Sequence, residues 1–194
     1  MNYQSAKTFI LKELDKLSPA LTYHGKHHTL DVLSVAESLC VAESIPYRET
    51  VLIMTAALLH DCGFLRHYHD HETHSCNIAR EVLPQFNYTE GDIQRINNMI
   101  MATKIPQSPL DCFAQILCDA DLDYLGRNDF YAIGQSLFSE MKIMKLVETE
   151  DEWNKIQIRF LEAHRFFTKT SQNARDSCKR EHLEKLQKLM TKKK

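Results

Sequence analysis

Apolar residues recur at intervals of three and four positions along nearly the whole chain, which is the spacing of one face of an α-helix. Phe9, Ile10, Leu14 and Leu17 form one such stripe near the N-terminus. Only 5 Gly and 5 Pro occur in 194 residues, and turn-dense β folds need more of both. The pattern therefore predicts an all-α fold.

No low-complexity linker or internal repeat separates the helical segments, which indicates a single domain of about eight or nine helices. The second helix is expected to end before Pro46. Thr89 is expected to be the N-cap of one helix. In the following helix, Pro109 is expected in the first turn and Gly126 is expected to stop the helix. The later helices are expected over 47–61, 71–83, 89–103, 108–126, 129–147, 151–167 and 171–190.

The composition argues against several classes of protein. The net charge of -2 gives no overall basic footprint for nucleic acid. The longest uncharged apolar stretch, Val51–Leu59, is too short to cross a bilayer, and the N-terminal segment has no signal-peptide core. The six cysteines include no CxxC pair and are expected to be buried free thiols. We therefore expect a cytoplasmic protein without a membrane span.

Histidines are dense in the first half of the chain. Eight of the 10 histidines fall between positions 24 and 74, in the segments YHGKHH, LLHD and RHYHDHETH. The HETH segment is no zinc-protease motif, because His71 and His74 are three positions apart and that motif needs four. Imidazole is the commonest metal ligand among side chains, so this density favours a metal site. Metal storage by the segment 66–74 alone is a further hypothesis.

A ligand set can be assembled from three helices. His28 opens one helix and the pair His60–Asp61 closes the next, at the end of an otherwise apolar run. Asp119 and Asp121 interrupt a third apolar helix, where a carboxylate needs a cation or hydrogen-bond donors. Two imidazoles and two carboxylates suit one divalent ion of Mn, Fe, Ni, Zn or Mg and leave positions for water and substrate.

The segments YHGKHHTLDV, AALLHDCGF and CDADLDYLG, in this order, resemble the HD superfamily of metal-dependent phosphohydrolases. These are all-helical proteins named for the adjacent His-Asp pair. The resemblance implies four metal ligands, namely His28, His60, Asp61 and Asp121. Asp119 is the second choice for the last ligand, which usually follows a small residue in this family. The implied architecture is one HD-type helical bundle over residues 1–194, with a core of about 20–130 and C-terminal helices 128–190 packed on it.

The same resemblance implies further site residues. His24 stands where related phosphodiesterases have a histidine that protonates the leaving oxygen, although an exposed loop histidine has the same sequence context. His71 stands where a histidine reaches a second metal or the phosphate, and Glu72 could orient water. Thr103 and Lys104 stand where some dinuclear members carry histidines. This departure favours a mononuclear site, with Lys104 near a phosphate and any second metal bound through His71.

The predicted function is hydrolysis of a phosphate ester or nucleotide by a metal-activated water. Asp61 or Glu72 would accept the proton, and His24 would act as general acid. Lys104 and Arg66 are candidate phosphate contacts, as is Lys26, because they lie near the site in sequence. The alternative is a regulatory module that keeps the metal and senses a nucleotide without turnover. The expected partner is a small phosphorylated molecule, while the sequence leaves the oligomeric state open.

Overall fold

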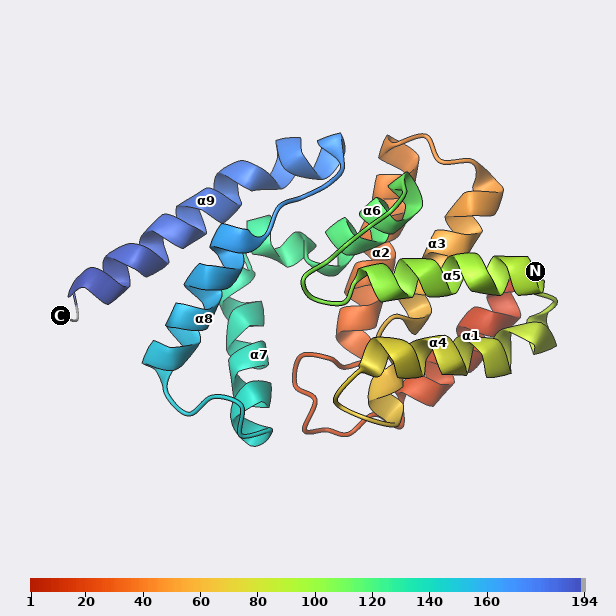
Figure 1. The fold of residues 1–194 in the computed structure, drawn as a ribbon, viewed down its shortest axis with the longest axis horizontal. Helices are drawn as coiled ribbons and strands as arrows, with labels where there is room; N and C mark the ends of the chain where they lie inside the picture. Colours follow the sequence, from red (N-terminus) through yellow and green to blue (C-terminus); the bar gives the residue numbers. More distant parts are fainter. Residues whose placement is uncertain (193–194) are drawn as a thin grey trace.

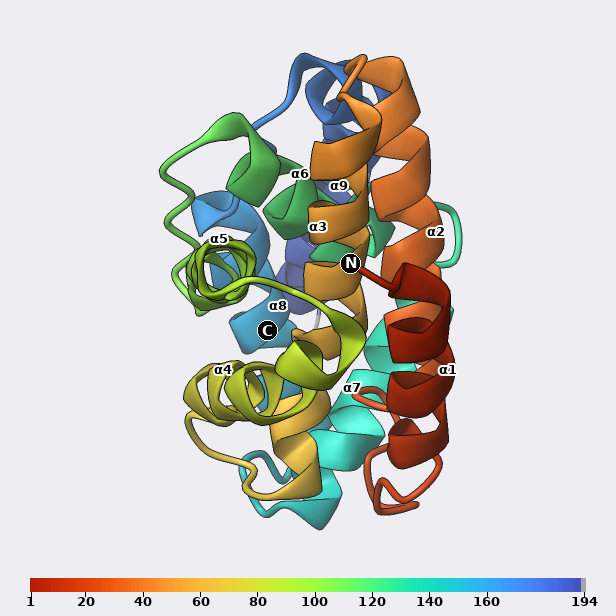
Figure 2. The same cartoon turned by 90° about the vertical axis from the view of Figure 1, so that its right-hand side faces the viewer.

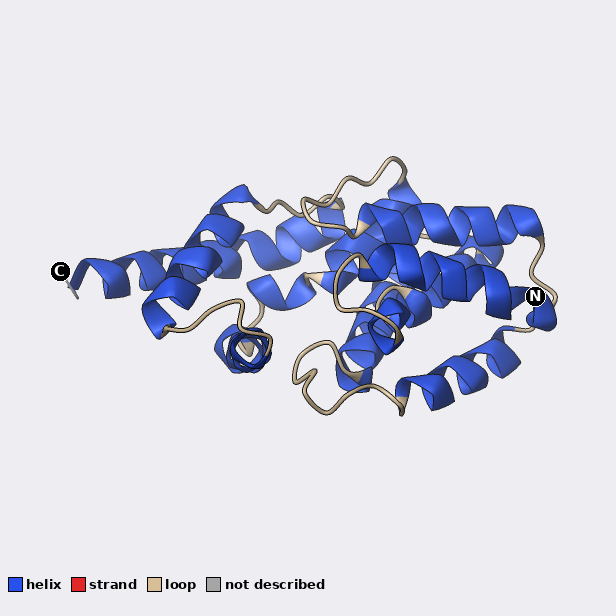
Figure 3. Cartoon of the chain, turned by 60° about the horizontal axis from the view of Figure 1, so that its bottom comes forward, coloured by secondary structure: helices blue, strands red, loops and turns tan. Residues whose placement is uncertain are grey.

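The computed structural model of the chain describes residues 1–192, and within this range the regular structure is entirely helical (Figure 3). This confirms the predicted all-α fold. The nine α-helices are α1 (Tyr3–Leu14), α2 (Lys26–Ala42), α3 (Tyr47–Leu59), α4 (His71–Val82), α5 (Glu90–Ala102), α6 (Cys112–Asp121), α7 (Phe130–Ile143), α8 (Glu150–Ala163) and α9 (Lys169–Lys192). Three short 3-10 helices, η1 (Cys62–Leu65), η2 (Leu83–Phe86) and η3 (Asp123–Gly126), connect them.

Helices α1 to α6 share one hydrophobic core, at one end of the elongated molecule (Figure 1). Helix α3 is the centre of this core and runs beside α2 (Figure 2). Every residue from Val51 to Leu59 is buried. A helix that is apolar all round must be covered on every side, which explains the long uncharged run in the sequence.

Helices α7, α8 and α9 form the other end of the molecule (Figure 1). Their core joins Leu125, Phe130, Leu161 and Leu186 to Tyr23, which comes from the loop before α2. Helix α9 packs on η3 and α8. The turn η3 therefore connects the two groups of helices directly after α6.

Several helix ends differ from the expected ones. Thr89 does cap α5, through a capping box with Asp92. Helix α6, in contrast, begins at Cys112, because the Asp111 side chain accepts a 2.8 Å hydrogen bond from the Ala114 amide. Pro109 therefore lies in the preceding loop rather than early in the helix. Helices α7 and α8 also end earlier than expected.

Most of the cysteines lie in the protein interior. Four cysteines, Cys40, Cys62, Cys76 and Cys118, are buried free thiols as expected. Cys112 is exposed, because it occupies the first turn of α6 at the surface, and Cys178 is only partly buried, which corrects the prediction for these two residues. No helix within residues 1–192 has both the length and the apolar character to cross a membrane.

Gly63 allows the chain to turn tightly against α4 directly after His60 and Asp61. A Cβ atom at this position would lie 1.8 Å from the carbonyl oxygen of His71. The Gly63 amide donates a 2.8 Å hydrogen bond to Ser75 Oγ, and that hydroxyl donates to the His60 carbonyl at 2.6 Å. Because Gly63 has no side chain, the start of α4 can approach the end of α3 closely, and the hydrogen bonds of Ser75 hold the two together.

We expect Gly63→Ala to lower the free energy of unfolding by about 3 kcal/mol, because the new methyl group would overlap backbone atoms of α4. Chemical denaturation followed by circular dichroism would measure the loss. Gly91→Ala is the matched control, since a Cβ there meets only Thr89 Oγ1 at 3.9 Å. In that exposed helical position alanine should stabilise the protein by about 0.5–1 kcal/mol. Equal stability of the two variants would contradict this interpretation of Gly63.

Candidate metal centre

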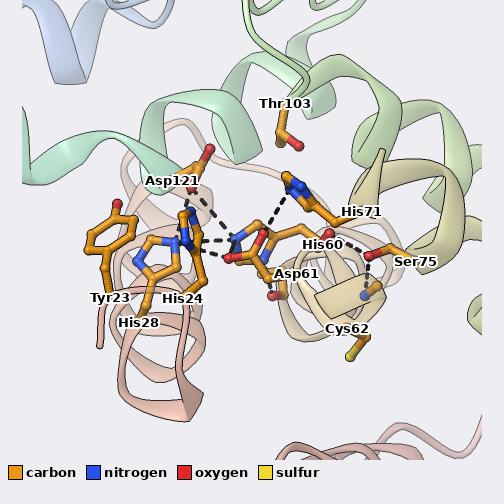
Figure 4. Close-up of polar contacts among 12 residues, drawn as sticks. Tyr23, His24, His28, His60, Asp61, Cys62, His71, Ser75, Thr103 and Asp121 are labelled. Carbon is orange, nitrogen blue, oxygen red and sulfur yellow. Dashed lines mark hydrogen bonds and ion pairs between the residues drawn. The ribbon is translucent and has the colours of Figure 1, made fainter. Parts of the chain in front are cut away.

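The ends of three helices bring the predicted ligands together (Figure 4). His28 lies in the first turn of α2, and Asp121 is the last residue of α6. His60 caps the C-terminus of α3, and Asp61 follows it before η1. His28, His60 and Asp61 are buried, whereas the Asp121 side chain is partly exposed.

The ligand atoms of His28, His60 and Asp121 all lie within 4.8 Å of one another, and Asp61 lies beside the two histidines. His28 Nε2 lies 3.4 Å from His60 Nε2 and 3.2 Å from Asp121 Oδ1. Asp61 Oδ2 lies 3.5 Å from His28 Nε2 and 3.3 Å from His60 Nε2. Ligand atoms about 2.1 Å from one ion are themselves about 3.0–3.4 Å apart in octahedral or tetrahedral geometry. These separations therefore fit a small divalent cation.

Two further observations fit a metal. Asp61 Oδ2 is buried and has no hydrogen-bond partner, which is costly for a carboxylate oxygen unless a cation binds it. His60 Nδ1 lies 2.8 Å from the carbonyl oxygen of Ala57. A proton on Nδ1 would be donated to this carbonyl, and the lone pair of Nε2 would then face the centre.

The electrostatics of the centre favour a cation. Burial raises the pKa of Asp61, but the charges and hydrogen bonds of His60, His71 and His24 together outweigh burial and lower this pKa well below its usual value. For Asp121, the hydrogen bonds and positive charges of His28 and His60 likewise outweigh burial and lower the pKa. Burial lowers the pKa of His60, yet the Asp61 and Asp121 carboxylates together raise it well above normal, so this ring holds a proton that a bound metal would replace. Both carboxylates are therefore ionised at neutral pH and supply the negative charge that a divalent ion needs.

Asp119, the second choice for the last ligand, faces another part of the molecule. Its carboxylate accepts hydrogen bonds of 2.8 Å from the Phe167 and Thr168 amides and of 2.7 Å from the Thr168 hydroxyl. Asp119 and Asp121 are two positions apart on α6 and so point in different directions. Asp119 thus connects α6 to the segment before α9, and Asp121 alone faces His28 and His60.

Substitution of the two aspartates should separate these roles. We expect Asp121→Ala to lose the bound metal in elemental analysis of the purified protein. Asp119→Ala should keep the metal but lower the free energy of unfolding by about 2–4 kcal/mol, because three donors would lose their acceptor. Loss of metal from Asp119→Ala and its retention by Asp121→Ala would reverse the assignment.

His71 and Glu72, in the first turn of α4, lie on the open side of the centre. His71 Nε2 is 3.4 Å from Asp61 Oδ1 and 3.5 Å from Glu72 Oε1. The His71 ring stacks on Phe64, with ring centroids 4.1 Å apart. His71 therefore contacts Asp61 at the edge of the centre, and binding of a second metal through His71 stays a prediction.

His24 is paired with a carboxylate that the sequence analysis did not identify. Its Nδ1 lies 2.5 Å from Oε1 of Glu140, a fully buried residue of α7. The amides of Tyr23 and His24 donate to Glu140 Oε2 at 2.8 and 3.0 Å. Burial lowers the pKa of His24, but the hydrogen bond to Glu140 and the negative charge of Asp61 raise it above normal overall. His24 is thus held in place by α7 rather than free in an exposed loop.

The three cations proposed as phosphate contacts lie away from the centre. Lys26 Nζ is 2.7 Å from Asp15 Oδ1, and Lys104 Nζ is 2.6 Å from Asp70 Oδ1. Arg66 forms a bidentate pair with Glu81. Each of these cations is bound to a carboxylate near the surface, and none of them lines the cavity beside the metal ligands.

A cavity of about 250 Å³ opens beside the centre. His24, Asp61, His71, Glu72 and Asp121 line one part of it, and residues of η3, α7 and α8 line most of the remainder, together with Tyr23, Thr103, Ile105 and Leu122. Within the described residues, one group of three potential metal ligands has all its ligand atoms within 4.8 Å of one another, and it consists of His28, His60 and Asp121. The histidine-rich segment 66–74 forms no such group by itself, so the storage hypothesis has no preformed site there.

The comparisons with known proteins agree with this geometry. The family model for the HD domain matches residues 25–123, slightly more than half of the chain. The chain therefore belongs to the HD domain family, whose members are generally metal-dependent phosphohydrolases.

A protein of Clostridium beijerinckii described as an uncharacterized protein is also similar to this chain. It is 33% identical over 101 residues, which cover 50% of this chain and 62% of that relative. The alignment thus spans less than two thirds of the relative's length. No solved structure matches the chain.

Proposed function

We propose that the protein is a metal-dependent hydrolase of a phosphate ester or nucleotide. The observation that carries the proposal is the set His28, His60, Asp61 and Asp121, whose ligand atoms converge at one end of a cavity large enough for a small molecule. A structural metal site has no need of such a cavity, whereas a catalytic site must admit substrate.

The ligand set would hold one divalent ion. When bound, this ion would polarise phosphoryl oxygens and lower the pKa of water towards about 7. His60 is oriented for this role by the Ala57 carbonyl and Asp61 by its position directly after α3. Mn, Fe, Ni, Zn and Mg are all compatible with two imidazoles and two carboxylates.

Proton transfer is assigned to two other residues that line the cavity. His24 is the general acid: its pairing with Glu140 favours the protonated ring and leaves Nε2 for the leaving oxygen. Of the two candidate bases, Asp61 has both oxygens close to histidines of the centre. The Glu72 carboxylate contacts His71 at 3.5 Å through one oxygen. We therefore assign the proton of the attacking water to Glu72.

Removal of a ligand should abolish both metal binding and hydrolysis. In His60→Ala or Asp61→Ala, phosphate release should fall about 100-fold or more, since a metal supplies several kcal/mol of transition-state stabilisation. Elemental analysis and a phosphate-release assay over monoesters, diesters and nucleotides would measure the two losses. His69→Ala, in an exposed loop, is the matched control. Undiminished turnover in His60→Ala would refute the mechanism, and metal-dependent nucleotide binding without any turnover would favour the sensor.

The Glu140 contact predicts a specific change in pH dependence. A general acid works while it is protonated, so activity should be lost as the pH rises through the pKa of His24. Glu140→Gln removes a negative charge and weakens the hydrogen bond, so this pKa should fall and the alkaline limb of kcat/KM should move to lower pH. The exposed Glu90→Gln should leave the profile unchanged. An unshifted alkaline limb in Glu140→Gln would exclude His24 as the acid.

A further inference from the structure

The cavity extends from the metal ligands into an apolar chamber. This chamber is the part of the cavity lined by Leu125, Phe130, Leu137, Met141, Trp153 and Phe160. These residues come from η3, α7 and α8, so the C-terminal helices build the walls. Gln157 adds an amide to the lining, and its Nε2 donates a 3.2 Å hydrogen bond to Asn154 Oδ1.

The cavity has no lysine or arginine in the part of its lining that the structure describes. Its imidazole and carboxylate side chains are His24, Asp61, His71, Glu72 and Asp121, at the end with the metal ligands, and two tyrosines, Tyr23 and Tyr124, also line it. In the chamber, away from these side chains, a second phosphate or a carboxylate on the substrate would therefore face apolar walls and the neutral Gln157 amide. Without a cationic partner, burial of such a group is strongly unfavourable.

Aromatic rings account for much of the chamber wall. Phe130, Trp153 and Phe160 all line it, and Trp153 is stacked on Phe138 at a centroid distance of 5.9 Å. Aromatic side chains bind flat apolar groups through large contact areas and preferred ring geometries. The volume of about 250 Å³ for the whole cavity limits the ligand to a small molecule.

From these observations we infer that the substrate carries a single phosphoryl group on a small, uncharged aromatic group, which binds in the chamber. This inference rests on the proposed phosphohydrolase function, because the metal ligands would bind the phosphoryl group. The carboxylates and the apolar walls together disfavour nucleoside diphosphates, triphosphates and other polyanions.

Binding of non-hydrolysable phosphonates tests the inference without requiring turnover. Metal-loaded protein would be titrated by calorimetry with phenylphosphonate, methylphosphonate and 4-carboxyphenylphosphonate. We expect phenylphosphonate to bind about tenfold or more tightly than methylphosphonate, because the ring buries apolar area. The carboxylated ring should also bind about tenfold or more weakly than phenylphosphonate. Equal affinity for the methyl and phenyl compounds, or tighter binding of the carboxylated ring, would overturn the inference.

A charge placed in the chamber should reverse this preference. Met141→Lys adds a cation to the wall and is expected to bring the affinity for 4-carboxyphenylphosphonate to at least that for phenylphosphonate. Ile143→Lys is the matched control, since residue 143 lies on the same helix but is 53% exposed and outside the lining. Should Met141→Lys not retain the wild-type helix content, Phe160→Leu tests the wall through a weaker affinity for phenylphosphonate. Unchanged preference in a folded Met141→Lys variant would count against the chamber as the binding site.

The binding assay and the phosphate-release assay can fail independently. Absence of phosphate release from every ester would refute the proposed function, even if phosphonates bind with the expected order. Phosphate release with a preference for glycerol phosphate or ADP over phenyl phosphate would refute only the substrate class. The two results therefore distinguish an error about the chamber from an error about the metal centre.

Discussion

Four ionisable side chains meet at the edge of a hydrophobic core, and the arrangement of the helices around them follows from this constraint. His28, His60 and Asp61 are buried, and Asp61 Oδ2 has no hydrogen-bond partner. Groups of this kind are tolerated only where something of opposite charge compensates them. The ends of α2, α3 and α6 must therefore converge at one point, and the apolar residues of α3 fill the space behind it.

Contacts outside the ligand set hold this convergence in place. The turn at Gly63 lets α4 approach the end of α3, and the Ser75 hydroxyl joins the two through the His60 carbonyl. On the other side, Asp119 connects α6 to the segment before α9. His60, Asp61 and Asp121 thus lie on elements that are themselves fixed by a hydrogen bond or a close backbone contact, which is the condition for a preorganised site.

The helical fold and the proximity of His28, His60 and Asp121 were predictable because their signals are short-range patterns. Apolar spacing indicates helices, and His60 and Asp61 interrupt an apolar run conspicuously. Glu140 was missed because it lies 116 positions from His24 and resembles any glutamate of an amphipathic helix. Arg66, Lys26 and Lys104 were near the site in sequence, but side-chain direction, which the sequence does not reveal, pairs each with a surface carboxylate. The chamber depends on how α7 and α8 pack, which periodicity alone does not determine.

The boundary between the two groups of helices has an evolutionary consequence. The HD family match ends at residue 123, whereas the chamber walls begin at Leu125 and continue into α8. The chemistry that defines the family and the surface that would select the organic part of a ligand are therefore encoded in consecutive parts of the chain. If the chamber binds the organic part of the substrate, mutations in the second part would alter ligand preference and leave His28, His60, Asp61 and Asp121 unchanged. Descendants of one ancestor could thus diversify in specificity through their C-terminal helices alone.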